Sequence, residues 1–162
     1  LNEAKRARLR PPENLDAWGI YHLGLQHMYR FNKTDNQIAA GHFECATQLE
    51  PGFARAYAAR SFTSFQTAFL RYTTDTTQDV SDARRFAEKC VEIDPVDPFG
   101  NFTLGRAHWL RGDPEAGMPW IDSIRSYMRC NALADWPIYN LKTTTMPFFG
   151  QKKGHARRAP TF

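Results

Sequence analysis

The sequence predicts an all-α fold of about three helix–turn–helix repeats. Three observations lead to this prediction: an apolar pattern with helical spacing that recurs along the chain, a proline after each of its first two copies, and capping residues at the resulting helix boundaries. No stretch shows a convincing alternation of apolar and polar residues, so we expect no β-strand. The 162 residues are enough for one domain with a buried core.

The repeat is clearest in two segments that align without gaps, AAGHFECATQLEP at 39–51 and ARRFAEKCVEIDP at 83–95. In both, small or apolar residues recur at intervals of four, three and three, and a proline follows two residues later. This spacing predicts one face of a helix that ends at the proline. A third copy begins at Gly117 and keeps the stripe, but Arg129 replaces the proline.

Each unit also carries a small residue in its first helix. Ser61 and Gly105 lie ten residues after Pro51 and Pro95, and Gly24 fills the same role in the first unit. A small side chain there lets two antiparallel helices approach closely. We therefore expect these three residues at helix crossings.

Capping signals agree with these boundaries. The Asp-Pro pairs at 97–98 and 113–114 are typical of an N-cap followed by proline in the first helical position. Residues 34–37, Thr-Asp-Asn-Gln, fit a capping box, and Gly112 is placed to close the preceding helix. The expected helices are 14–31, 35–49, 53–71, 80–93, 98–111 and 114–128.

Three segments, NLDAWGIYHLGLQHMY, HFECATQLEPGFARAYA and DPFGNFTLGRAHWLRGDPEA, resemble tetratricopeptide repeats (TPR). Leu104-Gly105, Gly112-Asp113 and the terminal prolines stand in the expected positions. The resemblance covers 14–129 and implies a TPR-type α-solenoid with repeats at 14–51, 52–95 and 96–129. The segment 130–162 would be a degenerate fourth repeat or a basic tail.

Two of the units depart from the usual repeat length of about 34 residues. About three additional residues follow Tyr29, and a polar insertion at 72–78 separates the helices of the second unit. Arg60 also stands where Leu23 and Leu104 stand in the other units. These departures affect the expected regularity of the solenoid.

The segments RARLRPPENLDAW and YHLGLQHMYRFN resemble the repeat regions that follow bacterial class III adenylate or guanylate cyclase domains, and those that follow winged-helix DNA-binding domains. This resemblance implies the C-terminal regulatory part of a bacterial signalling protein. The chain begins at Leu1 and not at a methionine, so we expect 1–13 to be a linker or the end of a preceding domain.

Charge and cysteine content limit the function classes. The net charge of +4 combines +2 in 1–13 and +5 in 136–162, so 14–135 carries −3. Cys45, Cys90 and Cys130 form no CxxC or Cys/His cluster, which predicts neither zinc nor a disulfide framework and favours the reducing cytoplasm. No apolar run reaches the roughly 20 residues that a membrane span needs, and no secretory leader is visible.

No residue pattern predicts catalysis, a metal site or a cofactor site. His22 and His27 lie five residues apart, which does not pair them on one helix face as metal ligands. The GQKKG segment near the end lacks the sequence and context of a phosphate-binding loop. We therefore expect no enzyme activity from this chain alone and no cofactor.

In stacked helical repeats the first helix of each pair lines a concave surface. Aromatic side chains with interspersed arginine are the residue types that dominate binding hot spots. The alternative for each of these aromatics is a role in the core. The predicted partner-binding groove comprises Trp18, Tyr21, Leu25, Met28, Arg55, Phe62, Phe65, Phe99, Phe102, Arg106 and Trp109.

The leading hypothesis is a non-catalytic scaffold that binds a protein, a peptide or another domain of its parent chain. One alternative is a regulatory fragment of a class III cyclase. Another is a nucleic-acid-associated module that uses the basic ends, although no aromatic residues interleave with the basic cluster at 152–158. An exposed last helix pair would also leave apolar surface for a homodimer.

Overall fold

The computed structural model describes residues 16–120 and 122, which belong to a compact unit, Leu1–Ile124. The labelled helices are α2 (Ala17–Met28), α3 (Lys33–Leu49), α4 (Ala54–Phe69), α5 (Thr77–Ile93) and α6 (Pro98–Leu110). Helical backbone resumes at 114–120. No strand occurs within the described residues, so the predicted all-α class is confirmed for this part of the chain. The predicted segments 1–13 and 130–162 lie outside it.

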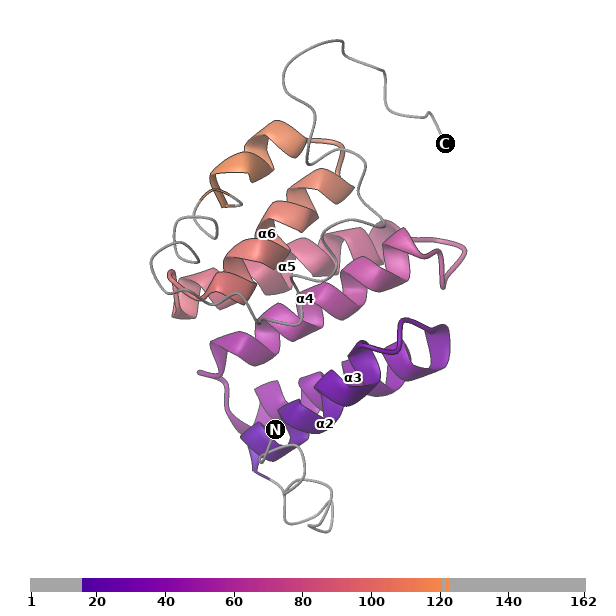
Figure 1. Ribbon diagram of the computed structural model, residues 1–162, viewed down its shortest axis with the longest axis vertical. Coiled ribbons are helices and arrows are strands. Elements are labelled where there is room, and N and C mark those ends of the chain that lie inside the picture. Colours follow the sequence, from indigo (N-terminus) through magenta and orange to yellow (C-terminus); the bar gives the residue numbers. More distant parts are fainter. Residues whose placement is uncertain (1–15, 121, 123–162) are drawn as a thin grey trace. The chain divides into compact units, whose positions relative to one another are not determined.

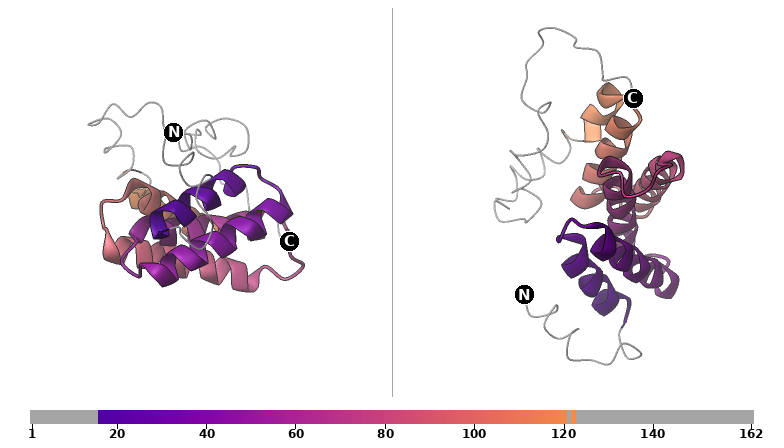
Figure 2. Two further views of the ribbon diagram at one scale, coloured as in Figure 1. Left: turned by 90° about the horizontal axis from the view of Figure 1, so that it is seen from below. Right: turned by 90° about the vertical axis from the view of Figure 1, so that its right-hand side faces the viewer.

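Short connections join the helices, and each helix packs against the next one along the chain. The order is visible in Figure 1, from α2 and α3 at one end to α6 at the other, and the right-hand view of Figure 2 shows the same succession. In addition, α4 contacts both α2 and α6. The first helices of the three predicted units are therefore neighbours.

Two of the predicted small residues lie where successive helices cross. A Cβ atom at Gly24 of α2 would lie 2.5 Å from Cε1 of Phe43 in α3, so only glycine leaves room for that ring. Ser61 of α4 is fully buried, and its hydroxyl donates a hydrogen bond to the carbonyl of Ala83 in α5 at 2.6 Å. Close helix approach at these positions is confirmed.

The third small residue also lies at a crossing. A Cβ atom at Gly117 would lie 2.7 Å from the carbonyl oxygen of Gly105, so the 114–120 helix approaches α6 backbone to backbone. Most of the repeated stripe is buried, but Ile93 is half-buried and Leu49 is 57% exposed. The fully buried members of the two stripes are Ala39, Phe43, Ala46, Ala83, Ala87 and Cys90.

The predicted caps around α6 are confirmed. Asp97 accepts a hydrogen bond from the backbone N–H of Gly100 at 2.8 Å, and proline occupies the first helical turn. Asp113 accepts one from the N–H of Ala116 at 3.1 Å. Gly112 adopts φ +80°, a left-handed conformation that glycine takes without steric cost.

The predicted start of α3 is wrong by two residues. Asn32, and not Thr34, is the N-cap: its side-chain oxygen accepts from the N–H of Asp35 at 2.9 Å, and its amide donates to the Asp35 carboxylate at 2.6 Å. Because the Asn32 side chain already accepts the hydrogen bond from the first turn of α3, the capping box at 34–37 does not form. Phe31 has φ +52°, and α2 has already ended at Met28 instead of the predicted residue 31.

Other boundaries also differ from the prediction. Asp16 is extended and caps α2 through the N–H of Gly19, so the helix begins at Ala17 and not at 14. Helix α5 begins at Thr77, three residues earlier than expected, because the last two residues of the polar insertion belong to it. Helix ends are the least certain part of any sequence-based assignment.

Candidate partner-binding surface

All eleven predicted groove residues lie in α2, α4 and α6. Along each helix most of them are spaced by three or four residues, which places them on one face. Since α4 contacts both α2 and α6, these faces come together. The structure groups most of the aromatic residues into two clusters. A separate ion pair links α4 to the N-cap of α6.

The first aromatic cluster lies at the start of α2 and α4. The ring centroids of Trp18 and Tyr21 are 5.7 Å apart, and Phe53 lies 5.4 Å from Trp18 and 5.1 Å from Tyr21. Tyr21 also contacts Phe43 of α3 at 5.7 Å and is buried, and this burial raises the pKa of its hydroxyl. Trp18 remains 41% exposed. The partly exposed ring of Trp18 therefore packs on the buried ring of Tyr21.

The second cluster, which we call the α4–α6 aromatic cluster, is larger. Phe62 lies 5.9 Å from Phe99 and 6.3 Å from Phe102, and Trp109 lies 6.3 Å from Phe65. These contacts join α4 to α6 along most of the length of α6. The members of the cluster are Phe62, Phe65, Phe69, Phe99, Phe102 and Trp109.

Arg106 lies within this cluster and is only 7% exposed. Its guanidinium carbon is 4.6 Å from the ring centroid of Phe102, 4.8 Å from that of Phe65 and 5.5 Å from that of Phe62. Its Nε is buried without a hydrogen-bond partner, and none of the described residues forms an ion pair with it. Burial lowers the pKa of Arg106 to about 10. Cation–π contacts with three rings therefore surround this charge, in place of an ion pair with a described residue.

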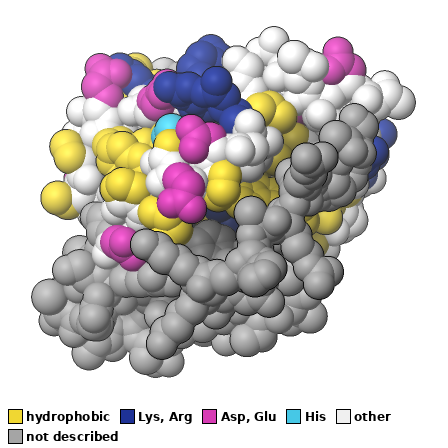
Figure 3. All heavy atoms as spheres, turned by 90° about the horizontal axis from the view of Figure 1, so that it is seen from above, with side chains coloured by type: hydrophobic (Ala, Val, Ile, Leu, Met, Phe, Trp, Pro, Cys, Tyr) yellow, Lys and Arg dark blue, Asp and Glu magenta, His cyan; other side chains and the backbone are white. Residues whose placement is uncertain are grey.

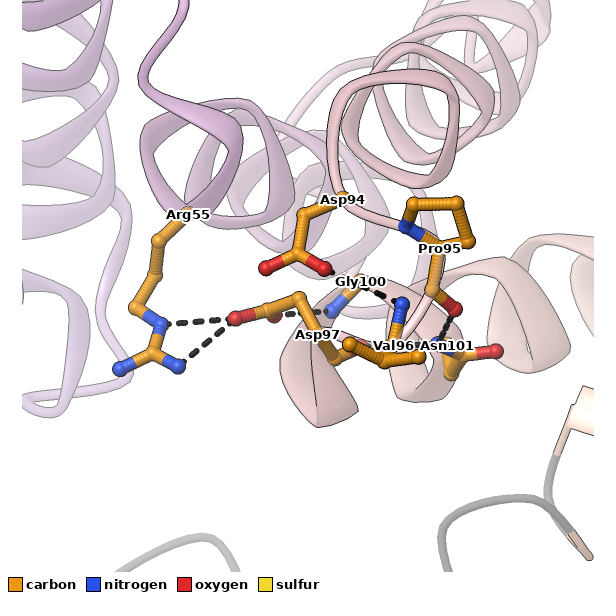
Figure 4. A network of polar contacts seen from close by, with 7 residues as sticks. All are labelled: Arg55, Asp94, Pro95, Val96, Asp97, Gly100 and Asn101. Carbon is orange, nitrogen blue, oxygen red and sulfur yellow. Dashed lines mark hydrogen bonds and ion pairs between the residues drawn. The ribbon is translucent and has the colours of Figure 1, made fainter.

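Arg55 and Asp97 form the ion pair (Figure 4). Arg55 donates from Nε at 2.9 Å and from Nη2 at 2.7 Å to one carboxylate oxygen, Oδ2. Asp97 is 4% exposed, and its other oxygen caps α6. Burial lowers the pKa of Arg55, but the hydrogen bonds and charge of Asp97 outweigh this effect, so the pKa is raised. Asn101 donates to the carbonyl groups of Pro95 and Asp97 and holds the same turn.

The remaining two predicted residues belong to neither cluster. Met28 is fully buried, and its carbonyl oxygen accepts a hydrogen bond from Nε2 of Gln66 in α4 at 3.2 Å. Leu25 is half-buried. The hydrogen bond from Gln66 to Met28 links α4 to the end of α2.

The burial of the eleven residues divides them by role. Helical spacing identifies a face but not the depth of each side chain beneath it, so several predicted groove residues contribute to the core. The half-buried or exposed members are Trp18, Leu25, Arg55, Phe102 and Trp109. The buried members are Tyr21, Met28, Phe62, Phe65, Phe99 and Arg106.

Sequence reasoning missed three participants. Phe53 precedes α4 as its non-helical cap, outside the helical stripe that the spacing detects. Phe69 continues the stripe of Phe62 and Phe65 by four residues, and this spacing could have found it. Asp97 was expected only as a cap, because nothing in the sequence relates it to Arg55, 42 residues earlier.

The ring of His22 lies in the first aromatic cluster, 4.8 Å from Trp18 and 5.5 Å from Tyr21, whereas His27 lies elsewhere. His27 lies 2.6 Å from the Asp35 carboxylate, which also accepts hydrogen bonds from Asn32 and Arg30. Hydrogen bonds from Asn32 and His27, followed by that from Arg30, lower the pKa of Asp35 to about 2. Within residues 16–120 and 122, no group of three or more His, Cys, Asp or Glu side chains is arranged to hold a metal ion.

Apolar side chains also reach the surface at the α6 end. Figure 3 views the molecule from the end where α6 lies in Figure 1 and shows patches of hydrophobic side chains with acidic side chains among them. Met118 is 37% exposed, and Leu110 and Trp120 are half-buried. None of the helices in the described part combines the length and apolar character needed to cross a membrane.

Comparisons with protein-family models, curated proteins and solved structures found no match to this chain.

Proposed function

We propose that this chain is a non-catalytic scaffold of the TPR type, which binds a protein segment on the face formed by α2, α4 and α6. The observation that carries the proposal is the contact of α4 with both α2 and α6, because it unites three helix faces that bear aromatic side chains. In a TPR array the first helices of successive repeats are neighbours in the same way. The resemblance of the sequence to this family supports the same arrangement.

The side chains of this face suit protein binding. Trp18 and Trp109 expose part of their rings and rest on buried aromatic neighbours, Tyr21 and Phe65. Such supported rings lose little conformational freedom when a partner covers them, which favours tight contacts. Phe102 and Arg55 add a third partly exposed ring and a cation. These residue types are enriched at the centres of interfaces.

The chemistry of the face favours binding over catalysis. Its carboxylate, Asp97, is buried and already engaged by Arg55 and by the first turn of α6. Arg55 and Arg106 are cations with no nucleophilic role at neutral pH. We therefore propose a regulatory or adaptor role, in keeping with the signalling proteins that the sequence resembles.

The test is a selection of peptides that bind the chain, followed by affinity measurements on variants. Peptides selected from a random displayed library would be titrated against the wild-type chain, Trp18→Ala and Trp109→Ala. We expect at least one tryptophan variant to weaken binding by about tenfold or more, as for an interface hot spot.

Leu49→Ala is the matched control. Leu49 is a large exposed apolar residue on α3, which is not one of the three helices of the proposed face. Its removal should leave the affinity unchanged. Peptides that bind all three variants as tightly as the wild type would show that this face is not the binding surface.

A further inference from the structure

We infer that Arg106 is the recognition point for a carboxylate of the bound segment, the side chain of a glutamate or aspartate flanked by apolar residues. This inference rests on the proposed function and specifies the partner's chemistry at one position.

The first argument is the missing counter-charge. Arg106 is more than nine-tenths buried, its Nε has no hydrogen-bond partner, and none of the described acidic side chains pairs with it. A guanidinium withdrawn from water without an acid is unusual, because buried charges are normally paired. Arg55 has such a partner, because it forms an ion pair with Asp97, the N-cap residue of the helix that carries Arg106.

The second argument is the position of the charge on the proposed face. Phe102 and Trp109 lie four residues before and three residues after Arg106 on α6, and both are half-buried. The aromatic cluster thus reaches the surface on both sides of Arg106 along the helix. A segment that packs apolar side chains against these rings would bring a carboxylate to the guanidinium between them.

The third argument concerns the kind of anion. Arg106 offers one positive charge in apolar surroundings, and Arg55, the other cation of this face, is already engaged by Asp97. A monoanionic carboxylate matches this charge and forms two parallel hydrogen bonds with the planar guanidinium. A phosphate carries up to two negative charges and would leave excess charge unpaired. The apolar rings favour a segment in which the acid is flanked by hydrophobic residues.

The experiment uses the full chain and four blocked peptides based on acetyl-Leu-Phe-Glu-Phe-Leu-amide. In the second peptide glutamine replaces the glutamate, and in the third phosphoserine replaces it. The fourth has alanine at this position and a free C-terminal carboxylate. Binding is measured by calorimetry, and the ¹⁵N-labelled Arg Nε–Hε signals are followed by NMR.

We expect the glutamate peptide to bind the wild-type chain at least about tenfold more tightly than the glutamine peptide, because hydrogen bonds to charged groups are the stronger ones. We also expect it to shift the Nε–Hε signal of Arg106, which currently has no acceptor. In Arg106→Met the preference for glutamate should disappear. Arg106→Lys keeps the charge but loses the planar pair of donors, so it should retain only part of the preference. It also provides a folded variant if the methionine variant does not fold.

Equal binding of the glutamate and glutamine peptides would overturn the inference, as would an unchanged Arg106 signal or the absence of any binding. A preference for the phosphoserine peptide or the free C-terminus would overturn the assignment to an acidic side chain and identify the other anion. The proposed function is decided separately by the library-selected peptides and the tryptophan variants. Selected peptides that depend on Trp18 or Trp109 but are indifferent to Arg106 would leave the scaffold proposal intact and remove this one.

Discussion

Arg55 and Arg106 project from neighbouring helices of the same proposed face, yet their surroundings differ. Arg55 is half-buried and donates two hydrogen bonds to Asp97, and its pKa is raised. Arg106 is more deeply buried and is surrounded by rings, and its pKa is lowered by burial. A charge that is paired within the fold stabilises it, whereas an unpaired one costs stability until a partner arrives. The comparison separates an arginine that is paired with an acid of the fold from one that has no acid partner among the described residues.

The largest effect is expected for Asp97→Ala. This change removes the N-cap of α6 and leaves Arg55 without its partner. We expect a loss of about 2 to 3 kcal/mol in the free energy of unfolding, measured by urea denaturation. Asp97→Asn is the control, since its amide oxygen can still cap the helix while the charge is lost, and it should cost about 1 kcal/mol less. Equal losses for both variants would mean that the cap contributes nothing.

The comparison is tested directly by making the same substitution at both arginines. Arg55→Met should lower the free energy of unfolding by about 2 kcal/mol, because it leaves the Asp97 carboxylate buried without a cation. Arg106→Met should raise it by about 1 kcal/mol, because it removes an unpaired charge and places a thioether against the rings. The two variants are compared in the same denaturation experiment. A loss of stability in Arg106→Met as large as that in Arg55→Met would show that the rings compensate fully for burial of the charge.

The smallest effect concerns the cation–ring contact itself. Among the described rings, Phe102 is the closest to the Arg106 guanidinium, at 4.6 Å. A double-mutant cycle of Phe102→Leu and Arg106→Met should give a coupling energy of about 0.5 to 1 kcal/mol from the two single and one double unfolding free energies. The cycle cancels the loss of the contact between Phe102 and Phe62. A coupling energy of zero would show that the contact between Phe102 and Arg106 contributes nothing to stability.

Much of the fold follows from local patterns in the sequence. The helical spacing of small residues predicted the fully buried Ala39, Ala46 and Ala83, and the small residue in each first helix predicted where helices cross. The Asp-Pro pairs predicted the starts of α6 and of the 114–120 helix. Each of these signals lies within a few residues of the feature that it predicts, so the sequence carries it directly.

The depth and pairing of side chains in the candidate site could not be predicted in this way. Whether Tyr21 is buried and Trp18 is exposed depends on Phe43 and Phe53, which come from later in the chain. The pairing of Arg55 with Asp97 likewise depends on the packing of α4 against α6. These are tertiary properties, and a spacing rule contains no information about them.

Asp97 divides its two carboxylate oxygens between different helices: Oδ1 holds the N–H of Gly100 in the first turn of α6, and Oδ2 holds the guanidinium of Arg55 on α4. A ligand that draws Arg55 outward therefore acts on the beginning of α6 through a single side chain. The start of α6 and the position of the Arg55 guanidinium are therefore fixed by the same carboxylate.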